Sequence, residues 1–263
     1  MTTRPLRTPA IAAAAAASLA LAATAQASVE PIRTLVPDTL TVCAFTGFPP
    51  TSYSDARGNW KGHDADFLRG FASSRGLALS ARESTAFDGI WRRPGSDECD
   101  VAAAGITITD ARASDARGAT FSAPYHSTLR AFVVRRGTRL TGVGGLAGKT
   151  VLVGKGTIAE EDVRTRVKRA RIAGVRIRYG GGEQANRRAV LAGQAFTYET
   201  DDLSAEQAAR SDHRLAVAWV HPRMTASGRA ARESLGYPVR TASTGLVQAL
   251  NAYIAVNKGN YGR

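Results

Sequence analysis

Short apolar runs and helically spaced segments alternate along the first half of the chain. Residues 40–45, 77–81 and 100–105 are short and mostly apolar, which predicts β-strands. Residues 64–76 carry apolar side chains at helical spacing and end at a glycine, and a second helix is predicted around residues 87–93. This β-α-β-α-β order is typical of a parallel sheet with helices on its faces.

The same order begins again in the second half. After a further strand at residues 131–137, the pattern predicts three strands and two helices: strands 149–153, 175–179 and 195–198, helices 158–170 and 185–192. We therefore expect an α/β fold of two similar lobes, each with a mostly parallel sheet flanked by helices.

The C-terminal part predicts a return to the first lobe. Residues 215–220 form a predicted strand, and the polar stretch 221–236 is expected to be a loop with a helix. Residues 237–240 are expected to cross back, and an amphipathic helix over 246–256 then rejoins the first lobe. Two crossovers would form a hinge. The expected division is a first lobe over 28–135, a second lobe over 136–236 and a return over 237–263.

Residues 1–27 have the pattern of a secretory signal peptide. Arg4 and Arg7 precede an uncharged, alanine-rich stretch over residues 10–23, and Ala25-Gln26-Ala27 has the small residues of a cleavage site. The stretch is short for a transmembrane span, so export with cleavage near Ala27 is favoured over a membrane anchor. The cleavage site also lacks the cysteine that a bacterial lipid anchor needs.

The composition is basic, with 35 Lys+Arg against 22 Asp+Glu. Nucleic-acid binding is not expected, because the densest basic run, residues 164–178, contains no aromatic side chains for base stacking. The run is better explained as a solvated helix face followed by a strand. Net positive charge would favour association with an anionic solute or with membrane headgroups.

No cofactor or metal site is recognised in the sequence. Gly148-Lys149-Thr150 resembles the end of a phosphate loop, but Val143 replaces the opening glycine and a strand follows. The four histidines do not have the spacing of metal ligands.

Cys43 and Cys99 are the only cysteines. They lie in the first predicted strand and just before the third, which can be neighbours in a parallel sheet. Export permits a disulfide, and two buried thiols would have the same sequence signature, so both alternatives stay open.

One arginine follows a strand end that is rich in hydroxyl groups. The small apolar residues over 100–105 lead into Thr107, and Thr109-Asp110 predicts a helix cap directly before Arg112. Ligands of open α/β sheets bind at such carboxyl ends of strands, where a guanidinium can hold a carboxylate through two hydrogen bonds. A capped turn with a surface arginine is the alternative.

A series of short motifs resembles the periplasmic solute-binding proteins that deliver polar amino acids to ABC importers. They occur in the family's order and spacing over residues 38–203. The matching stretches are Phe48-Pro49-Pro50, Gly62 to Phe67, Phe87-Asp88-Gly89-Ile90, Cys99-Asp100-Val101, Ala104 to Arg112, Phe121 to Tyr125, Leu146 to Val151, Gly154 to Thr157 and Thr200-Asp201. The resemblance implies the two-lobed type 2 periplasmic binding fold with two hinge crossovers.

The resemblance also implies how a ligand carboxylate would be held. Arg112 would bind it through a bidentate salt bridge. The hydroxyl and backbone N–H of Thr107 would assist, together with Thr157 from the opposite lobe.

The other ligand groups have implied partners as well. Asp201 would accept the α-ammonium, with the Gly105 carbonyl beside it. Phe48 and Phe87 would hold the ligand side chain between their rings. Tyr125 is expected in the core instead.

Some residues depart from the family pattern. Phe45 stands where members that bind cationic amino acids tend to have an acid, so a lysine- or arginine-type ligand is not expected. Ala104 replaces a common serine, and Phe196 replaces a frequent aspartate.

An enzyme of the same superfamily, a periplasmic cyclohexadienyl dehydratase, is an alternative. It needs a general acid, but Ser204 and Ile158 occupy the places where that branch has glutamate and asparagine. Glu199 or Asp202 could substitute, although a solvated or capping role is expected for both.

We therefore expect a monomeric, periplasmic substrate-binding component of an ABC importer, which is not an enzyme and carries no cofactor. Its partners would be an amino acid or similar small carboxylate and an inner-membrane ABC permease, and it would not bind nucleic acid. A sensor or accessory binding subunit is a third possibility.

Overall fold

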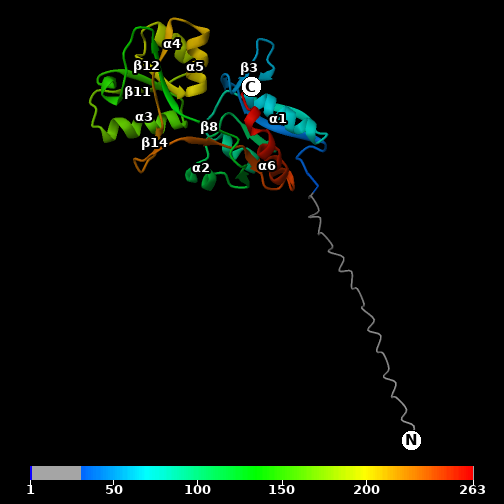
Figure 1. Cartoon of the computed structure of the whole chain (residues 1–263). Coiled ribbons are helices and arrows are strands. Elements are labelled where there is room, and N and C mark those ends of the chain that lie inside the picture. Colours follow the sequence, from blue (N-terminus) through cyan, green and yellow to red (C-terminus); the bar gives the residue numbers. More distant parts are fainter. Residues whose placement is uncertain (2–30, 263) are drawn as a thin grey trace.

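The computed structural model describes Met1 and residues 31–262, so the expected signal peptide lies almost entirely outside the described residues. Figure 1 displays two lobes, each built on a five-stranded sheet. The first sheet has the order β5-β1-β6-β17-β7. Its strands are β1 (Thr39–Phe45), β5 (Ala78–Ser84), β6 (Val101–Ala103), β7 (Ala119–Phe121) and β17 (Pro238–Arg240). The three predicted strands β1, β5 and β6 pair in parallel, as expected.

Alternate residues of β1 face two different cores. Leu40, Val42 and Ala44 pack with apolar residues of α1 (His63–Ser74) and α6 (Leu246–Asn257). Cys43 faces the other side, where it packs with η1 (Ile90–Arg92) and the end of β6. The predicted C-terminal helix thus rejoins the first lobe, and the chain end lies beside α1 (Figure 1).

Smaller elements complete the first lobe. The predicted helix around residues 87–93 consists instead of two short 3-10 turns, because a proline and glycines interrupt the segment. The smaller elements of the first lobe are η1, η2 (Pro94–Ser96), α2 (Asp110–Asp115), η4 (Lys258–Asn260) and the hairpin strands β2 (Gly47–Phe48), β3 (Ser52–Ser54) and β4 (Trp60–Lys61).

The second sheet has the order β11-β10-β12-β9-β13, with β10, β11 and β12 in parallel and β9 antiparallel to its neighbours. Helix α3 packs on one face and helices α4 and α5 on the other. The elements are β9 (Arg130–Arg135), η3 (Val143–Leu146), β10 (Thr150–Val153), α3 (Ile158–Arg169), β11 (Arg176–Tyr179), α4 (Glu183–Leu191), β12 (Thr197–Asp201), α5 (Asp202–Ser211) and β13 (Leu215–His221).

The crossovers lie earlier than the sequence pattern placed them. Strand β9 belongs to the second sheet, so the division at residue 135 was wrong: β9 carries apolar residues on both faces and fills the space between β12 and β13. The return also begins before residue 237, because β16 (Glu233–Leu235) pairs with β8 (His126–Thr128) of the outgoing segment. The two crossing segments are therefore hydrogen-bonded to each other.

The segment 221–245 contains strands and no helix, contrary to the expectation. β14 (Arg223–Met224) and β15 (Ala230–Ala231) form a hairpin, and β16 and β17 follow. Across the described residues, no helix combines the length and the apolarity needed to cross a bilayer.

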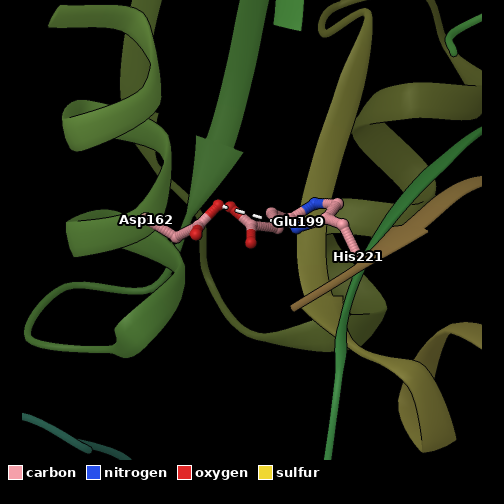
Figure 2. Close-up of side chains that lie close together, drawn as sticks. All are labelled: Asp162, Glu199 and His221. Atoms are coloured by element: carbon pink, nitrogen blue, oxygen red, sulfur yellow. Dashed lines mark ion pairs between the residues drawn. The ribbon is translucent and has the colours of Figure 1, made fainter. Parts of the chain in front are cut away.

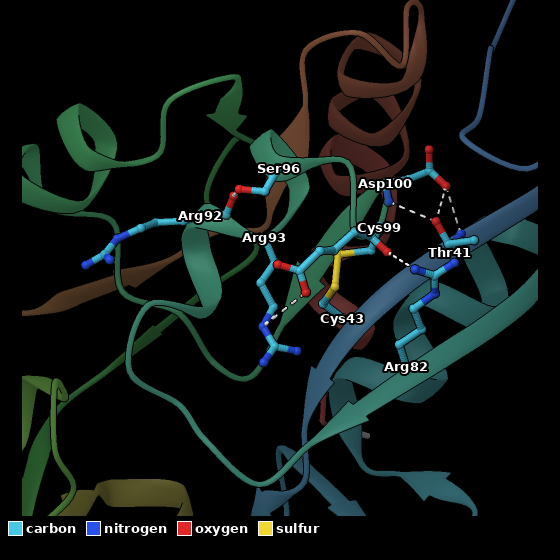
Figure 3. Close-up of a disulfide and its surroundings, with 9 residues drawn as sticks. Thr41, Cys43, Arg82, Arg92, Arg93, Ser96, Cys99 and Asp100 are labelled. Atoms are coloured by element: carbon cyan, nitrogen blue, oxygen red, sulfur yellow. Dashed lines mark hydrogen bonds and ion pairs between the residues drawn. A yellow bond between two sulfur atoms is a disulfide. The ribbon is translucent and has the colours of Figure 1, made fainter.

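A disulfide joins Cys43 and Cys99, with the two Cα atoms 5.7 Å apart (Figure 3). This decides the alternative that the sequence left open. Next to it, the buried carboxylate of Asp100 accepts hydrogen bonds from the backbone N–H and hydroxyl of Thr41 on β1. The Asp100 carboxylate also accepts a hydrogen bond from Ser243 in the returning segment. Covalent and polar contacts thus hold β1, β6 and the C-terminal segment together at this end of the sheet.

Candidate functional site

A cavity of about 510 Å³ lies between the two lobes. The carboxyl ends of β1 and β6 and the start of α2 form one wall, and the N-terminus of α3 and the end of β12 form the other. All seven predicted site residues line it: Phe48, Phe87, Gly105, Thr107, Arg112, Thr157 and Asp201.

Arg112 is buried in the first-lobe wall, and the expected Thr109 cap positions it by accepting a hydrogen bond from the Arg112 backbone N–H. Its terminal nitrogens donate to the carbonyl oxygens of Thr107 and Gly156, each at 3.0 Å. In the described part of the chain, no carboxylate forms an ion pair with Arg112. Burial lowers the pKa of the guanidinium to about 10, although distant carboxylates oppose this shift. The cavity wall therefore holds a cation without a counterion.

Aromatic rings and a helix terminus surround this cation. The Arg112 guanidinium carbon lies 5.4 Å from the Phe87 ring centroid and 4.8 Å from that of Trp91. On the opposite wall, α3 begins after Thr157, and the backbone N–H groups of its first turn have no partner within the helix. Such a terminus favours negative charge. Both walls therefore suit a carboxylate.

The hydroxyl groups of Thr107 and Thr157 already donate hydrogen bonds within the protein, which the sequence did not lead us to expect. The Thr107 hydroxyl donates to a carboxylate oxygen of Glu233 at 2.5 Å. The Thr157 hydroxyl donates to the Gly154 carbonyl at 2.7 Å. Each hydroxyl has already donated its single proton, so both can only accept from a ligand, and donors to a carboxylate must come from backbone N–H groups and Arg112.

Asp201 supplies an acceptor on the second-lobe wall. One of its oxygens caps α5 by accepting from the Ser204 backbone N–H at 2.9 Å. The other oxygen, Oδ2, is buried and has no hydrogen-bond partner among the described residues. Burial raises the pKa of this carboxyl, and the nearby Arg130 opposes the shift. An ammonium group in the cavity would give Oδ2 the partner it lacks.

Gly105 approaches the cavity in a left-handed backbone conformation, with φ +60°. A Cβ there would lie 3.1 Å from the Thr51 side chain, so glycine suits both the conformation and the space. Its N–H donates to the buried carboxylate of Asp64 at 2.9 Å. The Asp64 carboxylate also accepts hydrogen bonds from the hydroxyls of Tyr237 and Tyr261. The C-terminal residues therefore help to fix the Gly105 backbone.

The sequence analysis missed several polar residues of the cavity. Glu199, for which a solvated or capping role was expected, is buried and lines the cavity, so that interpretation was wrong. The five residues of β12, Thr-Tyr-Glu-Thr-Asp, are all buried, and this polar run was the one available signal. Other polar residues that line the cavity and were not predicted as site residues include Arg130, Glu183, Asn186, Thr200 and Glu233.

A network of buried charges crosses the cavity floor between the lobes. Arg130 at the start of β9 contacts Glu199 at 3.2 Å and Glu233 at 3.4 Å. Burial opposes the charge on Arg130, but the two carboxylates hold its pKa above the usual range. Glu233 lies on the returning strand β16 and Arg130 on β9, so this network joins β16 to the second sheet.

Asp162, Glu199 and His221 lie close together behind this floor (Figure 2). Their ligand atoms lie within 4.8 Å of one another, as metal ligands can. However, Arg166 donates to Asp162 at 2.6 Å and contacts the His221 ring nitrogen Nδ1 at 2.8 Å. Together with Arg130, it already places positive charge against this cluster. The donor set does not suit a further cation.

Among the described residues, the two lobes approach each other closely across the cavity. Arg112 reaches the Gly156 carbonyl, and Asp88 pairs with Lys155 at 3.3 Å. The backbones of Gly182 on the second lobe and Gly47 on the first lobe also lie close together. A Cβ atom added to Gly182 would lie 3.5 Å from the Gly47 carbonyl oxygen. The structure thus has its lobes in contact around the cavity.

Two lobes joined by paired crossover strands, with a cavity between them, define a type 2 periplasmic binding fold. The family of bacterial extracellular solute-binding proteins, family 3, matches residues 40–261, and the chain belongs to this family.

Solved structures agree with this assignment. The chain is similar to an ancestral arginine-binding protein bound to arginine, at 25% identity and a TM-score of 0.72, over 85% of this chain and 93% of that one. It is also similar to holo ArgBP from T. maritima, at 25% identity and a TM-score of 0.69, over 83% and 89% of the two chains. A sequence comparison with curated proteins finds no match.

A third structure shares the fold at lower identity. It is an ancestral amino acid-binding protein described as a precursor of cyclohexadienyl dehydratase. It is 22% identical, with a TM-score of 0.69, over 85% of this chain and 91% of that one.

Proposed function

We propose that this protein binds an amino acid between its lobes in the periplasm and delivers it to an ABC importer in the inner membrane. One observation carries the proposal. Arg112 and Asp201 line opposite walls of one cavity, and among the described residues Arg112 has no ion-pair partner and Asp201 Oδ2 has no hydrogen-bond donor. A zwitterion satisfies both groups at once.

The energetics of such a complex are consistent with useful affinity. Hydrogen bonds to charged groups contribute roughly 1.5–3 kcal/mol each, and a micromolar complex needs about 8 kcal/mol. Arg112 and Asp201 belong to different lobes, so a ligand that bridges them stabilises the closed arrangement and couples binding to hinge closure. The relatives described as arginine-binding and amino acid-binding proteins support an amino acid as the ligand class.

Thermal denaturation and calorimetry with the twenty amino acids would test this proposal. We expect one or more amino acids to raise the unfolding temperature, and Arg112→Met and Asp201→Asn each to abolish the shift. Asparagine retains the helix-capping oxygen, so Asp201→Asn removes the charge and not the cap. The matched controls Arg117→Met and Asp202→Asn change residues outside the cavity and should keep the shift.

The decarboxylated analogue of each bound amino acid should bind at least tenfold more weakly to the parent protein. If both cavity variants respond to ligand as the parent does, the proposal is wrong.

A dehydratase is the second candidate, because Glu199 lines the cavity and burial raises its pKa well above the ordinary range. A carboxyl group with a raised pKa is better suited to act as a general acid. We expect no aromatic product on incubation with prephenate, since Ser204 and Ile158 occupy the places of the residues that the dehydratase branch uses. Product formation that Glu199→Gln abolishes would favour the enzyme.

A further inference from the structure

A second carboxylate, Glu183, faces the same cavity from the second lobe. It is the first residue of α4 and follows the backbone of Gly180, Gly181 and Gly182, which also line the cavity. An acidic residue in the first helical turn is often an exposed group that interacts with the helix dipole. Glu183 differs from this pattern, because it is only 4% exposed.

The partners of Glu183 leave one of its oxygens available. The Tyr198 hydroxyl donates to Oε1 at 2.5 Å, and Arg187 Nε contacts the same Oε1 at 3.3 Å. Both of these contacts use Oε1, and among the described residues Oε2 has no hydrogen-bond donor. Glu183 lines this cavity and also the neighbouring pocket, and Oε2 is the oxygen left for a ligand contact.

The charges around the cavity favour a cation at this position. An amino acid's carboxylate and ammonium would use Arg112 and Asp201, and Asp88 is already paired with Lys155. The Arg130 network joins one cation to two carboxylates, Glu199 and Glu233. Five acidic and three basic side chains line the cavity, so carboxyl groups are in excess; the cation that Glu183 itself contacts, Arg187, lies outside the lining.

Neutral acceptors add to this negative wall. Asn186 and Thr200 line the cavity, and in the described structure the Asn186 side-chain carbonyl and the Thr200 hydroxyl oxygen are buried without a partner. On the first-lobe side, Phe48 and Phe87 line the cavity. A side chain with several N–H donors suits such a lining.

We propose that Glu183 determines ligand specificity by binding a cationic side chain of the amino acid through Oε2. This inference rests on the proposed function and defines its substrate class. It replaces the expectation from Phe45: the acid that the first lobe lacks is supplied by α4 of the second lobe.

Arginine and citrulline are suitable probes, because they have nearly the same shape and differ in the charge of the terminal group. We expect the parent protein to bind L-arginine at least about tenfold more tightly than L-citrulline by calorimetry at pH 8. Glu183→Gln should reduce this ratio to about one while retaining citrulline binding. Glu206→Gln, at an exposed residue of α5, is the matched control and should keep the ratio.

The ratio should also depend on pH in the parent protein. Burial raises the pKa of Glu183 to about 7, while Tyr198 and Arg187 oppose the shift and Asp201 adds to it. Ionisation of Glu183 between pH 6 and pH 8 should increase the ratio by up to about tenfold. Asp201 contacts the α-ammonium common to both probes, so its titration cancels in the ratio.

This pH profile needs no variant, so it tests the inference even if Glu183→Gln does not fold. A ratio near one at pH 8, a ratio unchanged in Glu183→Gln, or a ratio independent of pH would overturn the role of Glu183 while leaving amino acid binding intact. Failure of the parent protein to bind any amino acid would instead refute the proposed function, and the inference with it.

Discussion

Replacing Arg112 should abolish ligand binding and destabilise the ligand-free protein less than the loss of an ion-paired buried arginine would. A buried arginine usually has a carboxylate partner, and its removal then costs about 3–5 kcal/mol. Arg112 has two backbone carbonyl partners and no ion pair among the described residues. We therefore expect Arg112→Met to lower the free energy of unfolding by less than the loss of an ion-paired buried arginine.

The magnitude follows from the surroundings of Arg112. Burial lowers its pKa from 12.5 to about 10, and at 1.36 kcal/mol per pKa unit this corresponds to about 3 kcal/mol of destabilisation at neutral pH. Methionine removes that penalty and loses two hydrogen bonds from a charged donor, which contribute roughly 1.5–3 kcal/mol each. The two effects partly offset each other, so the free energy of unfolding should fall by no more than about 3 kcal/mol.

Urea denaturation followed by circular dichroism, without ligand, would measure this change. Arg130→Met is the matched comparison, because Arg130 is equally buried but contacts Glu199 and Glu233. We expect a loss of about 3–5 kcal/mol for that variant. If Arg112→Met loses as much stability as Arg130→Met, then Arg112 is a structural residue and the argument for an anion site fails.

Three further predictions concern the scaffold. Cys43→Ser with Cys99→Ser opens a loop of 56 residues and should lower the free energy of unfolding by about 2–4 kcal/mol in urea; an unchanged midpoint would contradict this. Tyr261→Phe leaves the buried Asp64 with one donor fewer and should cost about 1–2 kcal/mol, so a neutral effect would show that the C-terminal contact is unimportant. Burial, together with Arg166, lowers the pKa of His221 from 6.5 to about 4, so the unfolded chain alone gains a proton as the pH falls between these values. Stability should fall by up to about 3 kcal/mol over that range, and His221→Gln should lack this part of the pH dependence; equal slopes for the two proteins would refute the assignment.

The elements that depend on local chemistry were predictable from the amino-acid sequence. Helices α1, α3, α4 and α6 were predicted because their apolar residues follow helical spacing over several turns. The motif that ends at Arg112 was interpretable because a strand end, a capping threonine and a guanidinium are adjacent in the chain. These features need no information from distant residues.

The partners of each strand and the side chains that line the cavity became known from the folded structure alone. The apolar sequence of β9 is compatible with either lobe. Its place in the second sheet follows from its pairing with β12 and β13, which lie far along the chain. Glu183 and Glu199 resemble ordinary polar residues in the sequence, because burial and charge partners depend on elements that meet only on folding. The physical reason is that a carboxylate's role depends on its desolvation and on the donors around it, and neither is encoded by its immediate neighbours.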